Sequence, residues 1–283
     1  NGTTTGGAGG PTVTVTNGPS TPDLTISAQV IGTGGIIKAE GGMMSLQNSN
    51  TFSGAVTVND GALRGTDNFS FGTTAGGVTV NGAAGLQLSS AHIGDEALTL
   101  NTSNTLGFQP LAGSNSWAGT VTVQGTAYLS PNLAGDSCTL LGKITGPGAV
   151  IKSAAGTLYF SGSLANDYAG VTTVNSGTLV LNKTVANGAM TNNLIIGDGV
   201  GGANADVVRT EVTSQLPNTV AVTLNSSGQL ILNVDEAFGS LAGSGNVVVN
   251  TSASLGADPG FDNSSTTFSG VISGTGGLNK NGT

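Results

Sequence analysis

Short runs of alternating apolar and polar residues recur along the chain, and each run ends at a glycine-containing turn signal. Typical runs are AVTVNDGAL (55–63), VTTVNSGTLVLN (171–182) and AVTLNSSGQLILN (221–233). Alternation with a period of two predicts β-strands, and the Asn-x-Gly and Ser-Gly signals predict tight turns between them. Helices are not expected, because few stretches escape glycine or β-branched residues for the ~10 residues that a typical helix needs. The pattern therefore predicts an all-β chain.

Corresponding apolar residues return at a regular interval. Val58, Val80, Leu100 and Val123 hold equivalent places in successive runs, and the spacing of about 20–23 residues is the size of one turn of a β-solenoid. A single turn cannot bury its apolar face, so each coil must stack on the next, about 4.8 Å away. We therefore predict a right-handed parallel β-helix of about a dozen coils.

A longer repeat overlies this short period. Residues 31–65 align with residues 144–182, and residues 265–283 align with part of the same unit. Each copy has a Gly-rich turn and an apolar residue near a lysine. The two complete copies add a short strand, an aromatic element and a Val-rich strand. The chain therefore contains one structural unit at least twice.

An aromatic residue followed by Ser or Ala and then Gly occurs in each copy and once between the first two copies. The four aromatic residues are Phe52, Trp117, Tyr168 and Phe268. We expect them to pack at equivalent corners of the coil and to fix the register of the strands. The alternative is that exposed rings stack on sugars.

These motifs resemble the autotransporter-associated β-strand repeat, whose usual form is GxGxLxKxGxGTLxLxGxNTYxGxTxVxxGTLxL. Residues 144–182 match this form well, residues 31–65 and 144–283 carry the resemblance clearly, and residues 66–143 are compatible with it. The resemblance implies a right-handed β-helix in large secreted or surface-anchored bacterial proteins. It therefore implies an extracellular location or a place on the outer surface of a bacterium.

The same motifs predict the organisation of the chain. The Gly/Pro-rich residues 1–23 are expected to form a linker or a strand borrowed from a neighbouring module. Residues 24–283 are expected to form one continuous solenoid, with repeats at 31–65, 144–182 and 265–283. The last repeat stops midway, so we expect the natural protein to continue.

Composition removes several classes of function. Charged residues make up 8% of the chain and the net charge is −8 with seven basic residues, so nucleic acid is not an expected partner. Hydrophobic residues amount to 37% and follow a pattern, which argues against disorder. The single cysteine, Cys138, excludes an internal disulfide framework. No apolar run approaches the ~18 residues that span a bilayer, so no transmembrane segment is expected in this chain.

Catalytic residues are not expected. His92 precedes Asp95 and Glu96, and Ser137 stands in a Gly-Asp-Ser tripeptide, so a Ser-His-Asp triad is conceivable. We prefer to interpret HIGDE as a polar turn and the serine as part of a strand. β-helical enzymes that degrade polysaccharides use clustered acids and bases, and this chain has no comparable cluster.

Calcium is the one metal with a candidate site. Asp198, Asn204 and Asp206 stand on a Gly-rich segment, and hard cations prefer such oxygen ligands. The alternative is that these residues serve turn conformation, as Asp and Asn commonly do. No other cofactor is expected.

We therefore expect an extracellular structural module of a bacterial surface stalk, adhesin or filament. Solenoid ends carry open strand edges, so the expected partners are further repeats of the same protein or other copies of it, stacked head to tail. Two alternatives stay open. One is a carbohydrate- or host-binding adhesin passenger domain, with a glycan or host surface as partner, and the other is a β-helical polysaccharide-degrading enzyme.

Overall fold

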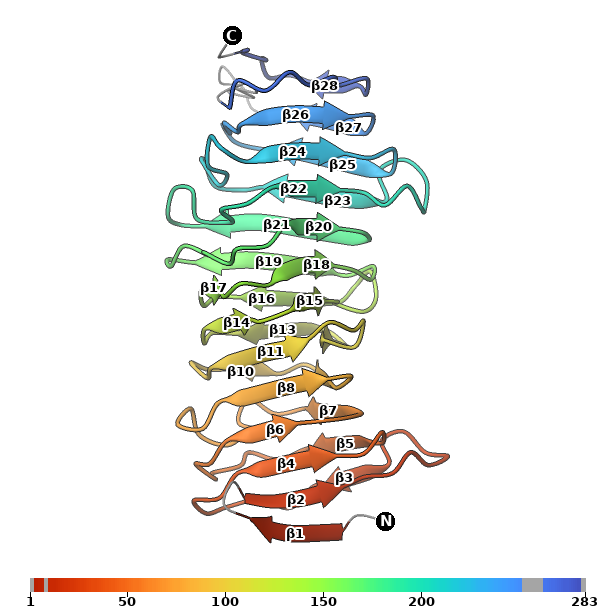
Figure 1. Ribbon diagram of the computed structural model, residues 1–283, viewed down its shortest axis with the longest axis vertical. Coiled ribbons are helices and arrows are strands. Elements are labelled where there is room, and N and C mark those ends of the chain that lie inside the picture. Colours follow the sequence, from red (N-terminus) through yellow and green to blue (C-terminus); the bar gives the residue numbers. More distant parts are fainter. Residues whose placement is uncertain (1–2, 8–9, 251–261, 281–283) are drawn as a thin grey trace.

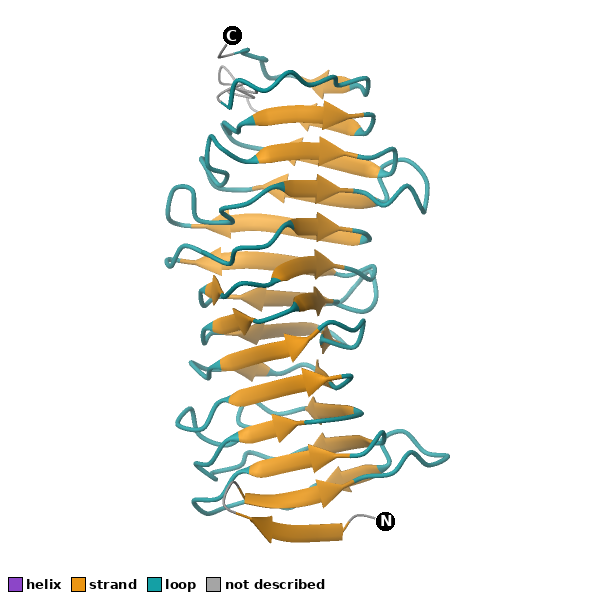
Figure 2. Cartoon of the chain, in the orientation of Figure 1, coloured by secondary structure: helices purple, strands orange, loops and turns teal. Residues whose placement is uncertain are grey.

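The chain forms a β-solenoid in the computed structural model, which describes residues 3–7, 10–250 and 262–280. The described part contains no helix, and its strands stack along one long axis as about 11 turns (Figures 1 and 2). Every strand pairing is parallel except that of β1 with β2. The all-β parallel solenoid expected from the alternating runs is thus confirmed.

Three sheets run along the solenoid and are named A, B and C. Sheet A contains, in spatial order, β1 (Thr3–Gly7), β2 (Gly10–Thr14), β4 (Ile36–Ala39), β6 (Val56–Val58), β8 (Val78–Gly82), β11 (Leu98–Thr102), β14 (Val121–Val123) and β17 (Ile144–Thr145). Sheet B contains β26 (Ser240–Gly243), β24 (Ala221–Leu224), β22 (Leu194–Ile196), β20 (Thr172–Val174), β18 (Ala149–Lys152), β15 (Thr126–Leu129), β12 (Phe108–Pro110), β9 (Gly85–Leu88), β7 (Ala62–Gly65), β5 (Met43–Leu46) and β3 (Leu24–Ile26). Sheet C contains β10 (His92–Ile93), β13 (Ser114–Trp117), β16 (Ser137–Leu140), β19 (Thr157–Gly162), β21 (Gly177–Lys183), β23 (Asp206–Thr210), β25 (Gly228–Leu232), β27 (Asn246–Val249) and β28 (Ile272–Gly274).

The core is a set of columns of apolar side chains that point into the solenoid. Val58 pairs with Val80, Val80 with Leu100 and Leu100 with Val123, and all four residues are buried. The register therefore confirms the equivalence that the spacing of these residues predicts. Such columns join in one core cluster that reaches from Val13 to Val249.

The two complete repeats use different sides of the solenoid. Strands of residues 31–65 alternate between sheets A and B, whereas strands of residues 144–182 after β17 alternate between sheets B and C. The central coils, from β10 to β19, have strands on all three sides. The same sequence unit is thus placed one side further round the axis in its second copy.

The Asn-x-Gly signals close these strand pairs. Gly61 and Gly177 end the signals of the two repeats and have positive φ angles of 64° and 68°. A Cβ atom would lie 2.3 Å from the Gly42 carbonyl oxygen at Gly61 and 2.6 Å from that of Ala154 at Gly177. Residues with a Cβ atom disfavour a positive φ, and at both positions that atom would collide with the backbone of the preceding coil. Glycine is therefore required at both corners.

The first strands lie within the stretch expected to be a linker or a borrowed strand, residues 1–23. β1 is antiparallel to β2, and β2 pairs in parallel with β4. Val13 and Val15 are buried in the common core. Residues 1–2, 8–9, 251–261 and 281–283 lie outside the described residues, so the end of the expected repeat at 265–283 does too.

Removing a core side chain is expected to destabilise the whole stack. Leu86 is fully buried in sheet B, so Leu86→Ala should lower the free energy of unfolding by about 2–5 kcal/mol through lost burial and a cavity. Leu133 is 63% exposed, and Leu133→Ala should cost less than about 0.5 kcal/mol. Urea denaturation followed by circular dichroism measures both variants, and equal losses would contradict the core position of Leu86.

Candidate functional site

Each complete repeat buries its lysine at the end of a strand. Lys38, on β4, donates hydrogen bonds to the carbonyl oxygens of Ala39, Glu40 and Asp60 at 3.1, 2.5 and 2.9 Å. Its side chain is 0% exposed. All three protons of the ammonium group thus have backbone acceptors.

Lys152, the equivalent residue on β18, repeats this arrangement. It is also 0% exposed and donates to the carbonyl oxygens of Ser153, Ala154 and Ser176 at 3.1, 2.7 and 2.7 Å. The middle acceptor residue is left-handed in both copies, with a φ of 66° at Glu40 and 64° at Ala154. Since that conformation is unfavourable for residues with a side chain, the ammonium group helps to hold the turn. It also ties the turn to that of the next coil.

A third buried lysine, Lys183, lies just after the second repeat. It is 0% exposed and donates to the Gly142 carbonyl oxygen at 2.8 Å. Its backbone pairs with the Gln215 side chain, whose Oε1 accepts from the Lys183 N–H at 2.8 Å and whose Nε2 donates to the Lys183 carbonyl at 3.0 Å. Lys183 carries no sequence signal for this site, because it follows the last motif residue and has no lysine counterpart in the first repeat.

The proposed calcium ligands each have a different environment. Asn204 accepts a hydrogen bond from Asn246 at 2.8 Å, and Asp198 Oδ1 accepts from the Val200 N–H at 2.8 Å. Asp206 is 1% exposed and has an oxygen without a hydrogen-bond partner. No group of three or more His, Cys, Asp or Glu side chains suited to a metal occurs among the described residues. Calcium binding stays a prediction.

Asp206 lies in a buried, polar part of the stack near Lys152. Burial raises the pKa of Asp206, a hydrogen bond with Ser227 lowers it, and the charge of Lys152 makes a smaller contribution in the same direction as Ser227. Burial lowers the pKa of Lys152 to about 7, and Asp206 acts in the opposite direction. The opposite charges therefore offset a small part of the burial cost at each other's position.

The conceivable catalytic triad is not assembled. His92 is exposed, and its Nδ1 lies 3.1 Å from the Ser116 hydroxyl. Ser137 pairs with Ser114 and Thr157 in the strand register, not with His92. Among the described residues, no carboxylate is hydrogen-bonded to His92. His92 is therefore not paired with Ser137, and no carboxylate among the described residues orients its ring, as the triad would require.

Glu96 lies inside the solenoid instead of next to His92. It is 3% exposed, and its Oε1 has no hydrogen-bond partner. Burial raises its pKa to about 8. The indole of Trp117 donates to the Glu96 backbone oxygen at 2.6 Å, which fixes the turn around it.

The aromatic residues of the repeats line the interior. Phe52, Trp117 and Tyr168 are at most 1% exposed, and the Trp117 ring lies 6.0 Å from Phe71 and 5.9 Å from Phe108, measured between centroids. The Tyr168 hydroxyl is hydrogen-bonded to that of Thr172. These three rings are not open to a sugar. Their expected role in setting the register stays a prediction.

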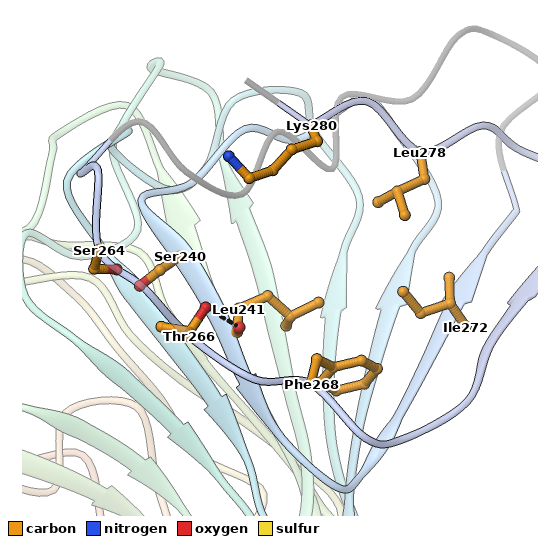
Figure 3. Close-up of a pocket in the computed structure, with 8 residues that line it drawn as sticks. All are labelled: Ser240, Leu241, Ser264, Thr266, Phe268, Ile272, Leu278 and Lys280. Carbon is orange, nitrogen blue, oxygen red and sulfur yellow. Dashed lines mark hydrogen bonds between the residues drawn. The ribbon is translucent and has the colours of Figure 1, made fainter. Parts of the chain in front are cut away.

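Phe268 borders a hollow at the C-terminal end of the described coils (Figure 3). The volume is about 250 Å³, and Leu241, Ile272 and Leu278 supply most of the apolar lining. Figure 3 shows Lys280 on the far side of this hollow from Phe268. Ile272 and Leu278 are 38% and 52% exposed, so this end of the stack presents apolar surface.

Lys152→Met tests the lysine corner because it keeps most of the apolar stem and removes the ammonium group. We expect the free energy of unfolding to fall by about 1–3 kcal/mol, since three buried carbonyl groups lose their hydrogen-bond donor. Lys143→Met is the control: the Lys143–Asp167 ion pair is partly exposed and is worth at most about 1 kcal/mol. Thermal and urea unfolding compare the two. A Lys152 variant as stable as the control would contradict the role.

Glu96→Gln is expected to change the pH dependence of stability. The folded chain holds the Glu96 proton up to about pH 8, whereas an unfolded glutamate releases it near 4.5. Between these values the folded state binds more protons, so stability falls as the pH rises. The melting temperature of Glu96→Gln should therefore exceed that of the wild type by a margin that grows across this range. Asp95→Asn, at an exposed neighbour, should show no such growing margin, and a constant margin for Glu96→Gln would refute the assignment.

Comparisons with known proteins agree with this architecture. The family described as passenger-associated-transport-repeat matches residues 36–64 and 150–181, the two segments with buried lysines and closing glycines. Adhesin BmaC autotransporter of Brucella suis biovar 1 (strain 1330) is 31% identical over 201 residues, which cover 71% of this chain.

The chain spans about 5% of the length of that relative. No solved structure matches. The described residues include no helix long and apolar enough to cross a membrane. Such passengers are located at the cell surface or outside the cell. The matched repeats, the adhesin similarity and the solenoid together identify this chain as an autotransporter passenger repeat protein.

Proposed function

We propose that this chain is a stiff structural section of a surface adhesin, in which the number of stacked coils sets the reach of the molecule. The observation that carries this proposal is the single core cluster from Val13 to Val249, flanked along its length by parallel ladders of two or three sheets. Bending such a stack would break backbone hydrogen bonds and core contacts together, so the section resists bending.

The proposal includes continued stacking at the C-terminal hollow. Ile272 and Leu278 expose apolar surface there, and β28 pairs on one side with β27. A further coil, from the same protein or from a second copy, would cover this surface and pair with the open edge. The same apolar burial and strand pairing that stabilise the stack would then drive self-association.

The similarity to an adhesin also supports a role in contacts with other surfaces. The relative is named as an adhesin, and a long passenger would hold its binding surfaces away from the cell. We therefore place host or glycan contacts on the outer faces of the solenoid. The comparisons favour this role over polysaccharide degradation, and no catalytic step is proposed.

End-to-end association is tested by sedimentation velocity and electron microscopy over a range of concentrations. The wild type should give rods of about 50 Å that lengthen by whole units as concentration rises. Ile272→Lys with Leu278→Lys should reduce this association, because two ammonium groups would have to be buried in the contact. Leu164 is 56% exposed and does not line the C-terminal hollow, so Leu164→Lys should leave the association unchanged.

Rods that stay single at every concentration would overturn the self-association part of the proposal. Association that is equal in the wild type, the double variant and the control would show that the contact lies elsewhere. Flexible or globular particles in place of rods would overturn the stiff-section proposal itself.

A further inference from the structure

Phe69 is the most exposed aromatic residue in the described part of the chain, at 57%. It lies between β7 and β8, where the coil crosses the side that sheet C occupies further along. Phe71, two residues later, is 1% exposed and packs against Trp117. One ring therefore anchors the segment in the core while the other stays in solvent.

The position of the Phe69 backbone is fixed by hydrogen bonds. Asp67 Oδ1 accepts from the Phe69 N–H at 2.9 Å. The buried Ser70 hydroxyl accepts from the N–H groups of Thr66 and Asp67 at 3.0 and 2.9 Å and donates to the Leu46 carbonyl oxygen at 3.1 Å. A ring on such a preorganised turn can bind a ligand without first ordering the backbone, which lowers the entropic cost of binding.

The preceding coil supports the same turn from below. Asn50 is 2% exposed. Its backbone N–H donates to the Phe69 carbonyl oxygen at 3.1 Å, and its side-chain amide donates to the Ser70 carbonyl oxygen at 2.7 Å. Asn50 Oδ1 also accepts from the Val30 N–H at 2.8 Å. The two coils thus form one rigid support.

A hollow of about 370 Å³ lies beside the ring. It is lined by Phe69, Ser49, Asn50, Thr51, Thr73 and Thr74, and none of these side chains is charged. The three threonines are exposed, and their hydroxyls make no internal hydrogen bond in the described structure. The hollow therefore offers one apolar face together with free groups that can both donate and accept.

From this arrangement we infer that the hollow beside Phe69 binds a neutral glycan. The C–H face of a sugar ring is apolar and fits on an aromatic face, while its hydroxyls suit the surrounding threonines. Anionic glycans are disfavoured, because the lining has no cation and the chain has a net charge of −8. This inference rests on the glycan-contact part of the proposed function and names the site and the class of glycan, but it depends on neither the stiff-section role nor self-association.

The test uses the intact chain and two glycan panels. Neutral oligosaccharides of glucose, galactose, mannose and N-acetylglucosamine form one panel, and sialylated and sulfated oligosaccharides form the other. Saturation-transfer NMR and titration measure binding to the wild type, Phe69→Ala, Phe69→Trp and Leu164→Ala. Leu164 is the matched control, since it is 56% exposed and does not line the hollow.

We expect at least one neutral oligosaccharide to bind the wild type and the Leu164→Ala chain equally. Phe69→Ala should weaken this binding by about fivefold or more, the loss of one aromatic contact, and Phe69→Trp should retain it. Melting temperatures should stay the same, because Phe69 is outside the core. Neutral binding that survives Phe69→Ala, a preference for the anionic panel, or no binding to either panel would overturn the inference. Rod length in the microscope reports separately on the stiff-section proposal.

Discussion

The structure depends on parallel pairing between successive coils. Each coil finds its hydrogen-bond partners in its neighbours, so the strand spacing of about 4.8 Å is imposed on every side chain along the axis. Inward positions become columns, as for Val58, Val80, Leu100 and Val123. The environment of a residue in this fold is therefore set mainly by the residues one coil above and one coil below it, and only secondarily by its neighbours in sequence.

Buried lysines solve a problem that this stacking creates. Tight corners turn backbone carbonyl groups inward, away from both strand ladders and water, and unpaired carbonyls are costly there. Lys38 and Lys152 satisfy three such groups each and connect a turn to that of the next coil. Burial opposes the charge, as the lowered pKa of Lys152 shows, and Asp206 offsets part of that cost. Polar groups in the core thus hold the corners, while apolar columns hold the sides.

The sequence predicts the features that follow from the regular spacing of apolar residues. It does not predict on which side of the solenoid a given strand or side chain lies. Alternation and the regular spacing gave the all-β solenoid, and the motif gave the family. The shift of the second repeat to sheets B and C was not predictable, because the repeat motif does not specify which side of the solenoid its strands occupy. Likewise, the sequence places Glu96 four residues after His92 but does not show that its side chain is buried or that its backbone oxygen accepts from the Trp117 indole. Phe69 carried no repeat signal either, since its exposure follows from one turn held by Asp67 and Ser70.

The unusual composition of the chain is itself a consequence of stacking. An outward side chain lies about 4.8 Å from its counterparts in the coils on either side, so a row of like charges would repel along the whole rod. Residues that can pair with copies of themselves avoid this cost. Asn101 donates to Asn81 and Asn81 to Asn59, while the threonines of the same strands, Thr57, Thr79 and Thr99, form a neighbouring row. The low charged content of 8% therefore agrees with stacked outer faces on which rows of like charge are unfavourable. It also leaves neutral hydroxyl and amide groups as the chemistry through which this solenoid can contact other molecules.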